Sequence, residues 1–246
     1  MGVRNIKLTL CYDGFDYHGW QIQPGSRTIQ GVLTDAIESL VGGQVRVTGA
    51  SRTDAGVSAL GQAALFEIDS PIPTENFAKA ITDRLPADIA VTEAVEVEPG
   101  FDIIGSVKSK LYRYAIFTGT NRPVMEIRHC WHLPAQLDTE AMARAAAMLV
   151  GKKDFKSFAS AADSRENSVR TILRCDVTKK DNWVYIETQG DGFLYNMVRN
   201  IVGSLVEVGA GRWRAEKIAE ILEAKDRTAA GPIAPAAGLC LMWIKY

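Results

Sequence analysis

The residues best suited to chemistry lie in one segment, which reads GASRTDAGVSALGQ at 49–62. Asp54 stands there among small residues that permit a ligand to approach closely, and Arg52 comes two residues before it. A neighbouring guanidinium keeps a carboxylate ionised, as a nucleophile or a general base must be. The simpler interpretation is a loop in which Asp54 makes a side-chain turn with Gly56. The segment therefore indicates either a reactive carboxylate or an ordinary turn.

Two further segments carry rings and cations that suit a nucleotide. The first reads KSKLYRY at 108–114, and as a strand it places Lys110, Tyr112 and Tyr114 on one face. Lys110 would bind a substrate phosphate and a tyrosine would stack on a base. The alternative is a solvated edge strand whose lysines discourage aggregation. The second segment, YDGFDYHGWQ at 12–21, is either a turn with packed rings or a ring-and-amide surface for nucleotides.

A third feature is a cation within an apolar helix. The segment GDGFLYNMVRN at 190–200 enters a strongly periodic helix, which Asp191 would cap, and places Arg199 near the apolar stripe. A buried charge without a partner is costly, so Arg199 requires one. We expect Asp54 to be that partner.

The charge balance restricts how the chain could bind nucleic acid. Lys and Arg number 28 and Asp and Glu number 29, a formal net charge of −1. Binding of RNA would therefore need a local basic surface. Residues 151–180 carry eight Lys or Arg residues against four Asp or Glu residues. Such a stretch is typical of a solvated face, but beside the aromatic-basic strand it favours an RNA partner. An apolar content of 47% excludes global disorder.

Hydrophobic periodicity predicts two halves with the same element order. For the first half we expect strands at 5–12, 44–50, 62–69 and 89–97 and helices at 29–40 and 75–85. Thr28 and Thr74 are the expected N-caps, and Gly42 and Pro86 would end the two helices. The order is βαββαβ, the ferredoxin-like arrangement.

The second half repeats this order. Its expected strands are 109–118, 127–133, 170–179, 183–189 and 239–245, and its expected helices are 139–150, 194–205 and 214–224. The predicted fold class is α+β, with two ferredoxin-like halves joined through a central, mostly antiparallel sheet and a catalytic cleft between them. The predicted domains are 1–104, which carries the Asp54 loop, and 105–246, which carries Tyr112 and Arg199.

The sequence also predicts the cellular location of the protein. Residues 1–14 alternate in polarity instead of forming a signal-peptide core, and no stretch approaches the roughly 20 apolar residues of a membrane-spanning helix. Cys11, Cys130, Cys175 and Cys240 form no Cys-x-x-Cys pair, which predicts reduced thiols. We expect a cytoplasmic protein without membrane contact.

The run His129-Cys130-Trp131-His132 invites comparison with a metal site. In a strand, residues 129 and 132 point to opposite faces, which is a poor geometry for chelation. We therefore expect no metal there.

Taken together, these segments resemble the tRNA pseudouridine synthase A family. The resemblance covers nearly the whole chain, through YDGFDYHGWQ at 12–21, GASRTDAGVSALGQ at 49–62, KSKLYRY at 108–114, DFKSF at 154–158, GFLYNMVRNIVGSLVEVG at 192–209 and AAGPIAPAAGLCL at 229–241. A single one of these would be weak, but all of them in this order and length are highly specific.

The resemblance implies an enzyme without cofactor or metal that isomerises uridine to pseudouridine in the anticodon stem-loop of tRNA, at positions 38, 39 and 40. It also implies a homodimer whose tRNA contacts both subunits. Asp54 matches the family's catalytic aspartate, Tyr112 the tyrosine that packs against the target base and Arg199 the basic partner of the aspartate. Arg52 and Leu239 match positions that line the site.

The chain departs from the family pattern at several positions. Ser58 stands where the family usually has His, and Asn196 and Lys153 also replace a common His. Ile103 and Ile104 stand where an Ala-Arg pair is usual. Because the Asp, Tyr and Arg are all present, we expect these changes to affect substrate choice, tRNA affinity or rate instead of reaction type.

Two alternatives belong to other functional classes. The first is a tRNA-binding or RNA-folding protein with decayed catalysis, in which the absent His and Arg mark a lost site. Salt-dependent tRNA binding without isomerisation would favour it. The second is a small-molecule hydrolase that uses Asp54. The sequence gives it little support, because its three histidines form no Ser-His-Asp order.

Overall fold

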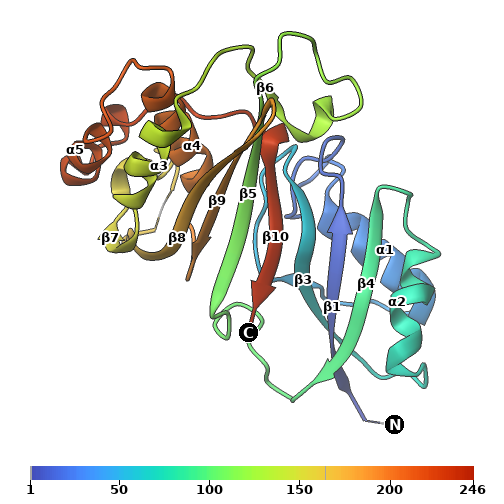
Figure 1. Ribbon diagram of the computed structural model, residues 1–246. Coiled ribbons are helices and arrows are strands. Elements are labelled where there is room, and N and C mark those ends of the chain that lie inside the picture. Colours follow the sequence, from blue (N-terminus) through green and yellow to red (C-terminus); the bar gives the residue numbers. More distant parts are fainter. Residues whose placement is uncertain (1, 164) are drawn as a thin grey trace. The chain divides into compact units, whose positions relative to one another are not determined.

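The computed structural model describes residues 2–163 and 165–246, which form two compact units. Unit 1 comprises the residues up to Lys108 together with Leu241–Tyr246, and unit 2 comprises Ser109–Cys240. The predicted division between residues 104 and 105 stays a prediction. In both units strands and helices are mixed and most strand pairs are antiparallel, so the α+β class is confirmed (Figure 1).

Unit 1 has the ferredoxin-like order of elements. Its elements are β1 (Arg4–Tyr12), α1 (Ile29–Val41), β2 (Thr48–Gly49), β3 (Ser58–Ile68), α2 (Thr74–Thr82) and β4 (Ile89–Val97). β1 lies between β4 and β3 and pairs antiparallel with both, while β2 pairs antiparallel with β3. The late strand β10 (Leu239–Lys245) also neighbours β3, through its unit 1 residues. Helices α1 and α2 cover one face of this sheet (Figure 1).

Local sequence signals explain most boundaries in unit 1. The Thr28 hydroxyl accepts a hydrogen bond from Gly31 N and caps α1, and Gly42 ends the helix in the left-handed conformation, as predicted. The expected cap of α2 was wrong: Pro73 precedes the helix and Thr74 is its first residue. The expected strand at 44–50 is reduced to the two residues of β2.

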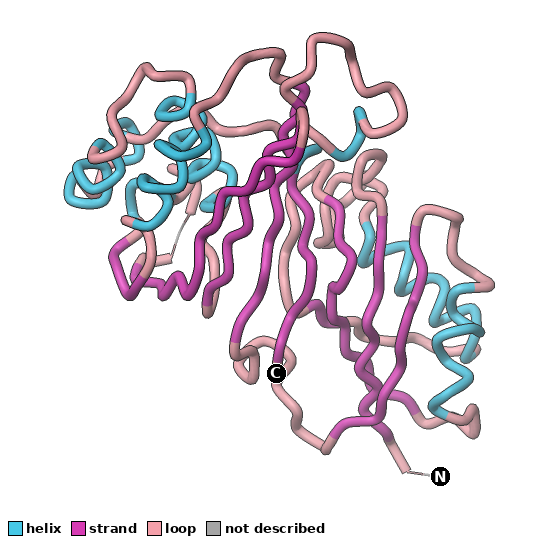
Figure 2. The backbone as a smooth tube through the Cα atoms, viewed as in Figure 1, coloured by secondary structure: helices cyan, strands magenta, loops and turns pink. Residues whose placement is uncertain are grey.

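Unit 2 combines further strands, mostly antiparallel, with α-helices. Its elements are β5 (Ser109–Phe117), β6 (Trp131–His132), α3 (Thr139–Ala147), β7 (Gly151–Asp154), β8 (Val169–Lys180), β9 (Trp183–Gly190), α4 (Met197–Gly209) and α5 (Lys217–Ala224). Within the unit the strand order is β5-β9-β8-β7, and the short β6 pairs parallel with β5. α3 packs on both β8 and α4, and most of α4 is buried. Figure 2 traces the same backbone with its helices and strands in different colours.

Several second-half expectations were wrong in detail. Residues 127–133 form a 3₁₀ turn (Ile127–His129) and the two-residue β6 instead of a strand. The predicted 139–150 helix ends at Ala147, and β7 follows where no strand was expected. Asp191 does not cap α4; its carboxylate accepts from Thr171 N, and Asn196 holds the N-cap position.

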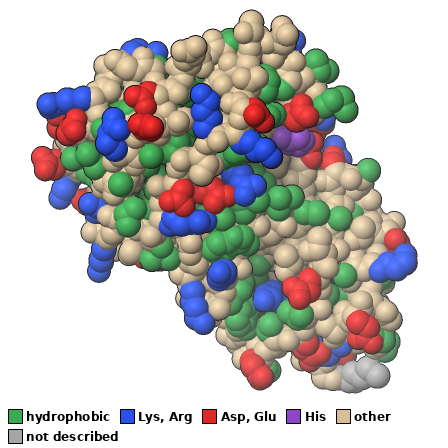
Figure 3. All heavy atoms as spheres, in the orientation of Figure 1, with side chains coloured by type: hydrophobic (Ala, Val, Ile, Leu, Met, Phe, Trp, Pro, Cys, Tyr) green, Lys and Arg blue, Asp and Glu red, His purple; other side chains and the backbone are tan. Residues whose placement is uncertain are grey.

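The surface agrees with the charge balance of the sequence. Figure 3 shows acidic and basic side chains interspersed on the visible face, as the net charge of −1 leads one to expect. Among the helices of residues 2–163 and 165–246, none combines the length and apolar character needed to cross a membrane.

Candidate functional site

Asp54 lies half-buried in the loop between β2 and β3 of unit 1. The turn around it is closed by the backbone, because the Asp54 carbonyl oxygen accepts a hydrogen bond from Val57 N at 3.1 Å. A backbone hydrogen bond therefore contributes to this turn. The interpretation of Asp54 as a turn-forming side chain and its interpretation as a reactive carboxylate both stay predictions.

The backbone of the 12–21 segment holds this turn in place. Trp20 N donates to Thr53 O at 3.0 Å, and Gly56 N donates to Tyr17 O at 3.2 Å. Gly14 lies so close that a Cβ built on it would come 2.0 Å from the Val57 carbonyl oxygen. Only glycine allows this approach. The aromatic segment therefore supports the Asp54 loop.

Side chains add three further clamps to the loop. The Tyr12 and Thr53 hydroxyls share a hydrogen bond of 2.8 Å, and Gln62 Nε2 donates to Ser51 O at 2.7 Å. The buried Ser58 hydroxyl accepts from Gly14 N at 3.1 Å. The residue that replaces the family's usual histidine thus ties the two segments together.

The buried Tyr17 phenol anchors the 12–21 segment, which supports the Asp54 loop. The Tyr17 hydroxyl donates to Asp88 Oδ1 at 2.7 Å and accepts from Arg27 Nη2 at 2.9 Å. The Arg27 guanidinium also lies over the Tyr17 ring, 4.4 Å from its centroid. Burial, followed by the hydrogen bond to the Asp88 carboxylate, raises the pKa of Tyr17 well above 10, so the phenol remains a donor. Arg52, in contrast, is exposed on the same loop.

In unit 2, Tyr112 lies on β5 opposite Thr188 of β9 and is buried. Its ring meets that of Phe193 edge-on, with centroids 5.1 Å apart and an interplanar angle of 87°. Tyr114 belongs to the core: it is fully buried and its hydroxyl donates to Pro235 O at 2.7 Å. The edge-strand alternative is wrong, since β5 has a neighbouring strand on each side in the sheet order, β10 and β9.

Arg199 is half-buried on α4 and has partners within unit 2. Its Nε donates to Ala234 O at 2.8 Å, and its Nη1 donates to Asn196 Oδ1 at 3.1 Å. Ala234 N donates in turn to Arg199 O at 3.2 Å. The 231–235 segment and α4 therefore position this guanidinium. An ion pair between Arg199 and Asp54 stays a prediction.

Two further predicted site residues also lie in unit 2. Leu239 is buried and directly follows the short 3₁₀ turn at Ala236–Gly238. Lys110 is half-buried on β5, opposite Gly190. Burial, and then the charge of Arg165, lowers the pKa of the Lys110 ammonium to about 8. Arg165 belongs to the 151–180 stretch whose cations were expected to favour an RNA partner.

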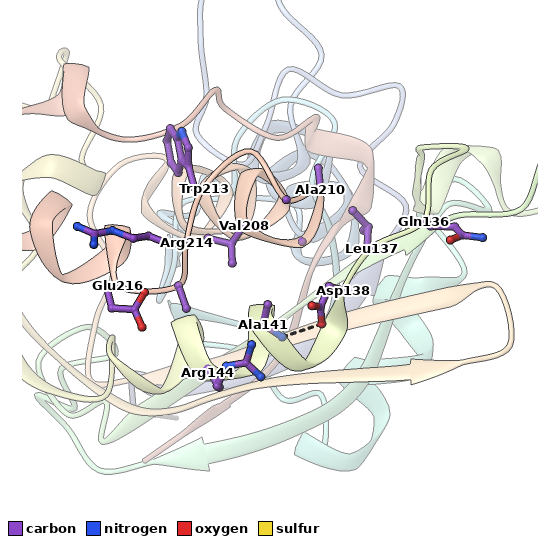
Figure 4. A pocket seen from close by; sticks show the side chains of 13 residues that line it. Gln136, Leu137, Asp138, Ala141, Arg144, Val208, Ala210, Trp213, Arg214 and Glu216 are labelled. Carbon is purple, nitrogen blue, oxygen red and sulfur yellow. Dashed lines mark hydrogen bonds between the residues drawn. The ribbon is translucent and has the colours of Figure 1, made fainter.

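One cavity of about 650 Å³ opens on the helical side of unit 2 (Figure 4). It lies between the start of α3 and the turn after α4, and Figure 4 shows the Trp213 indole and the Arg214 and Arg144 guanidinium groups around it. It contains none of the predicted site residues. Within the described parts of the chain, no group of three or more His, Cys, Asp or Glu side chains could hold a metal ion. All four cysteines are free thiols.

Comparison with known proteins decides the family. The sequence profile described as tRNA pseudouridine synthase matches residues 10–103 and 145–246. The chain belongs to the tRNA pseudouridine synthase family. It is 45% identical to tRNA pseudouridine synthase A of Acetivibrio thermocellus, an alignment that covers 99% of this chain and 100% of the relative. It is 44% identical to that of Moorella thermoacetica, over 98% and 99% of the two chains. The family assignment makes the chain an isomerase.

Sequence reasoning missed the residues that support the predicted site. The Tyr17–Arg27–Asp88 anchor was missed, because its members are 61 or more residues apart from Asp88 and no local pattern links them. The bonds of Asp163 and Arg165 to the Phe193–Tyr195 backbone were missed for the same reason. The sequence offered one signal for these supports, a charged residue near a family motif, such as Arg27.

Proposed function

We propose that this member of the tRNA pseudouridine synthase family isomerises uridine to pseudouridine in the anticodon stem-loop of tRNA, with Asp54 as the nucleophile. The observation that carries the proposal is the fixed backbone around Asp54, held on both sides by the 12–21 segment. A clamped loop of this kind presents a carboxylate in one position, as nucleophilic catalysis requires.

The reaction assigns a role to each predicted residue. The target uridine leaves its stack at a cost of a few kcal/mol. Asp54 then attacks C1′ or C6, or assists formation of a glycal. The C1′–N1 bond breaks, the uracil turns, and C1′ bonds to C5, which releases its proton while N1 gains one. Tyr112 holds the detached ring and its hydroxyl can relay the C5 proton. Arg199 keeps Asp54 ionised.

The remaining assignments concern substrate and setting. Arg52 and Leu239 line the site, and Lys110 binds substrate phosphate. The enzyme acts as a homodimer in the cytoplasm, with tRNA on both subunits and without cofactor or metal. Light scattering on the purified protein tests the dimer, and a monomer at micromolar concentration would contradict it.

The test of the catalytic assignment is pseudouridine mapping on unmodified tRNA transcripts. We expect the native protein to produce pseudouridine in the anticodon arm and Asp54→Asn to produce none, while tRNA binding and thermal stability stay near native. Asp83→Asn is the matched control, because Asp83 is an exposed carboxylate of unit 1 that forms an ion pair with Lys79 at the surface. Pseudouridine formed by Asp54→Asn would exclude this nucleophile.

Ser58 and Ile104 depart from the family pattern, and these departures favour a second candidate function, a tRNA-binding protein with decayed catalysis. Ser58 contributes a hydrogen bond to the clamp of the Asp54 loop, which argues against decay at that position. Native protein that binds tRNA but forms no pseudouridine would favour the second candidate.

A further inference from the structure

Three cationic side chains come together at one end of the unit 2 sheet. Lys110 on β5 lies opposite Gly190 on β9, and Gly190 lies opposite Ile172 on β8. Arg170 precedes Ile172 by two residues, and Arg165 lies in the loop that leads into β8. The charge of Arg165 lowers the pKa of both Lys110 and Arg170, in addition to the larger effect of burial on each. The three groups are therefore electrostatic neighbours.

Arg165 is held in a fixed orientation. Its Nε and Nη2 donate to the two oxygens of the Asp163 carboxylate at 2.8 and 2.6 Å, a bidentate pair. Its Nη1 donates to Phe193 O at 3.0 Å, and Asp163 also accepts from Tyr195 N at 2.7 Å. Within residues 2–163 and 165–246, these bonds use three of the five N–H donors of the guanidinium, and the other two can serve a ligand. The side chain stays 45% exposed, so a ligand can reach it.

Two of the cations lie beside carboxylates. Asp163 binds Arg165, and Asp191 accepts from Thr171 N at 2.9 Å beside Arg170. Like charges in a partly buried place repel one another, and an anion placed between them relieves that cost. The cluster therefore favours an anionic ligand with several acceptor oxygens.

Aromatic rings adjoin the cluster directly. The carbonyl that accepts from Arg165 belongs to Phe193, whose ring meets Tyr112 edge-on. The Arg170 side chain lies 3.6 Å from the position that a Cβ on Gly192 would occupy, next to Phe193 in the chain. A group that binds the cations thus lies beside the surface expected to receive a base. A nucleotide has both parts, a ring and a phosphate.

We propose that Lys110, Arg165 and Arg170 form a binding site for one backbone phosphate of the RNA substrate, next to the Tyr112–Phe193 ring pair. The inference rests on the proposed function for the identity of the RNA and adds Arg165 and Arg170 to the substrate-binding residues. The site takes a phosphodiester as part of a strand, and it positions the strand instead of reading its sequence.

The test is equilibrium binding of an anticodon stem-loop RNA across a salt series, in an Asp54→Asn background that prevents turnover. For the double variant Lys110→Met and Arg165→Gln, we expect the slope of log affinity against log salt to fall by about 0.7–0.9, the value of one phosphate contact. Affinity at low salt should fall about tenfold or more. Lys179→Met is the matched control: it removes one charge from the far end of β8, where the side chain is exposed.

A second variant guards against loss of folding. Lys110→Met alone leaves Arg165 and its bonds to Asp163 and Phe193 in place, so a cooperative thermal melt should show that the variant folds, while its RNA affinity should still fall. Native slope and affinity in both variants, or an equal loss in Lys179→Met, would overturn the phosphate site. A methylphosphonate at a single RNA position should reproduce the loss in the native cluster and have no further effect in the double variant.

The two proposals fail in different ways. If Asp54→Asn abolishes pseudouridine but the cluster variants bind RNA normally, the enzyme assignment stands and the phosphate site is wrong. If the cluster variants lose RNA affinity while the native protein forms no pseudouridine, the phosphate site stands and the catalytic assignment is wrong.

Discussion

Replacing Tyr17 by Phe tests whether the 12–21 segment positions the Asp54 loop. The hydroxyl donates to the Asp88 carboxylate at 2.7 Å, and a hydrogen bond to a charged group contributes about 1.5–3 kcal/mol. The Asp88 side chain is 30% exposed, so water replaces part of the bond and the lower end applies, about 1.5–2 kcal/mol. For a chain of this size that is a fall in melting temperature of about 3–8 °C.

The catalytic consequence follows from the backbone. The carbonyl of Tyr17 accepts from Gly56 N, so a shift of this residue moves the turn that contains Asp54. Because a misplacement near 1 Å can cost about a hundredfold, we expect kcat to fall by about ten- to a hundredfold while tRNA affinity changes little. Thermal melting and single-turnover pseudouridine formation are the two assays.

Tyr195→Phe is the matched control, because the Tyr195 residue is 45% exposed and its hydrogen bonds within residues 2–163 and 165–246, from N to Asp163 and from Ser160 N to its carbonyl oxygen, use the backbone. It should behave as native in both assays. Native melting and native rate in Tyr17→Phe would refute the reasoning that the phenol anchors the loop. Lower melting with a native rate would show that the anchor stabilises the unit without positioning Asp54.

Three further predictions address other parts of the chain. Lys110, with a pKa of about 8, is cationic below that pH and neutral above it, so tRNA affinity at constant ionic strength should weaken as pH rises through 8, and Lys110→Met should remove this change. Gly203→Ala should cost about 3 kcal/mol or prevent folding in a thermal melt, because its Cβ would lie 1.7 Å from Pro232 O on the packed face of α4. Ile104 is 59% exposed, so Ile104→Arg should leave stability within about 0.5 kcal/mol and raise tRNA affinity in a filter-binding assay, and unchanged affinity would show that residue 104 lies away from the RNA.

Sequence reasoning succeeded where a local signal decides the structure. The Thr28 side chain caps the start of α1, and the left-handed backbone of Gly42 ends it. β4 has its predicted bounds, Ile89–Val97. It failed where partners distant in sequence decide. Residues 127–133 are apolar enough for a strand, yet only Trp131 and His132 pair with β5. β7 has little apolar character, and it forms a strand because its backbone pairs antiparallel with β8.

The site shows the same division. Asp54, Tyr112 and Arg199 are recognisable from the motifs around them, whereas their supports depend on tertiary contacts. The departure at Ile103 is explained by packing, since this residue is buried in a cluster with Ala50 and Ala63. Its neighbour Ile104 is exposed, so the two departures have different physical meanings.

The return of Leu241–Tyr246 to unit 1 has a consequence for biosynthesis. These residues supply the Tyr246 hydroxyl that donates to Ile103 O at 3.0 Å and the ring that packs 5.2 Å from Phe101. A ribosome must synthesise all of Ser109–Cys240 before unit 1 can gain them. At about 5–20 residues per second this is a delay of several seconds or more. Unit 1 therefore emerges first but is completed last, and until then β3 has β1 and the short β2 as neighbours but lacks β10.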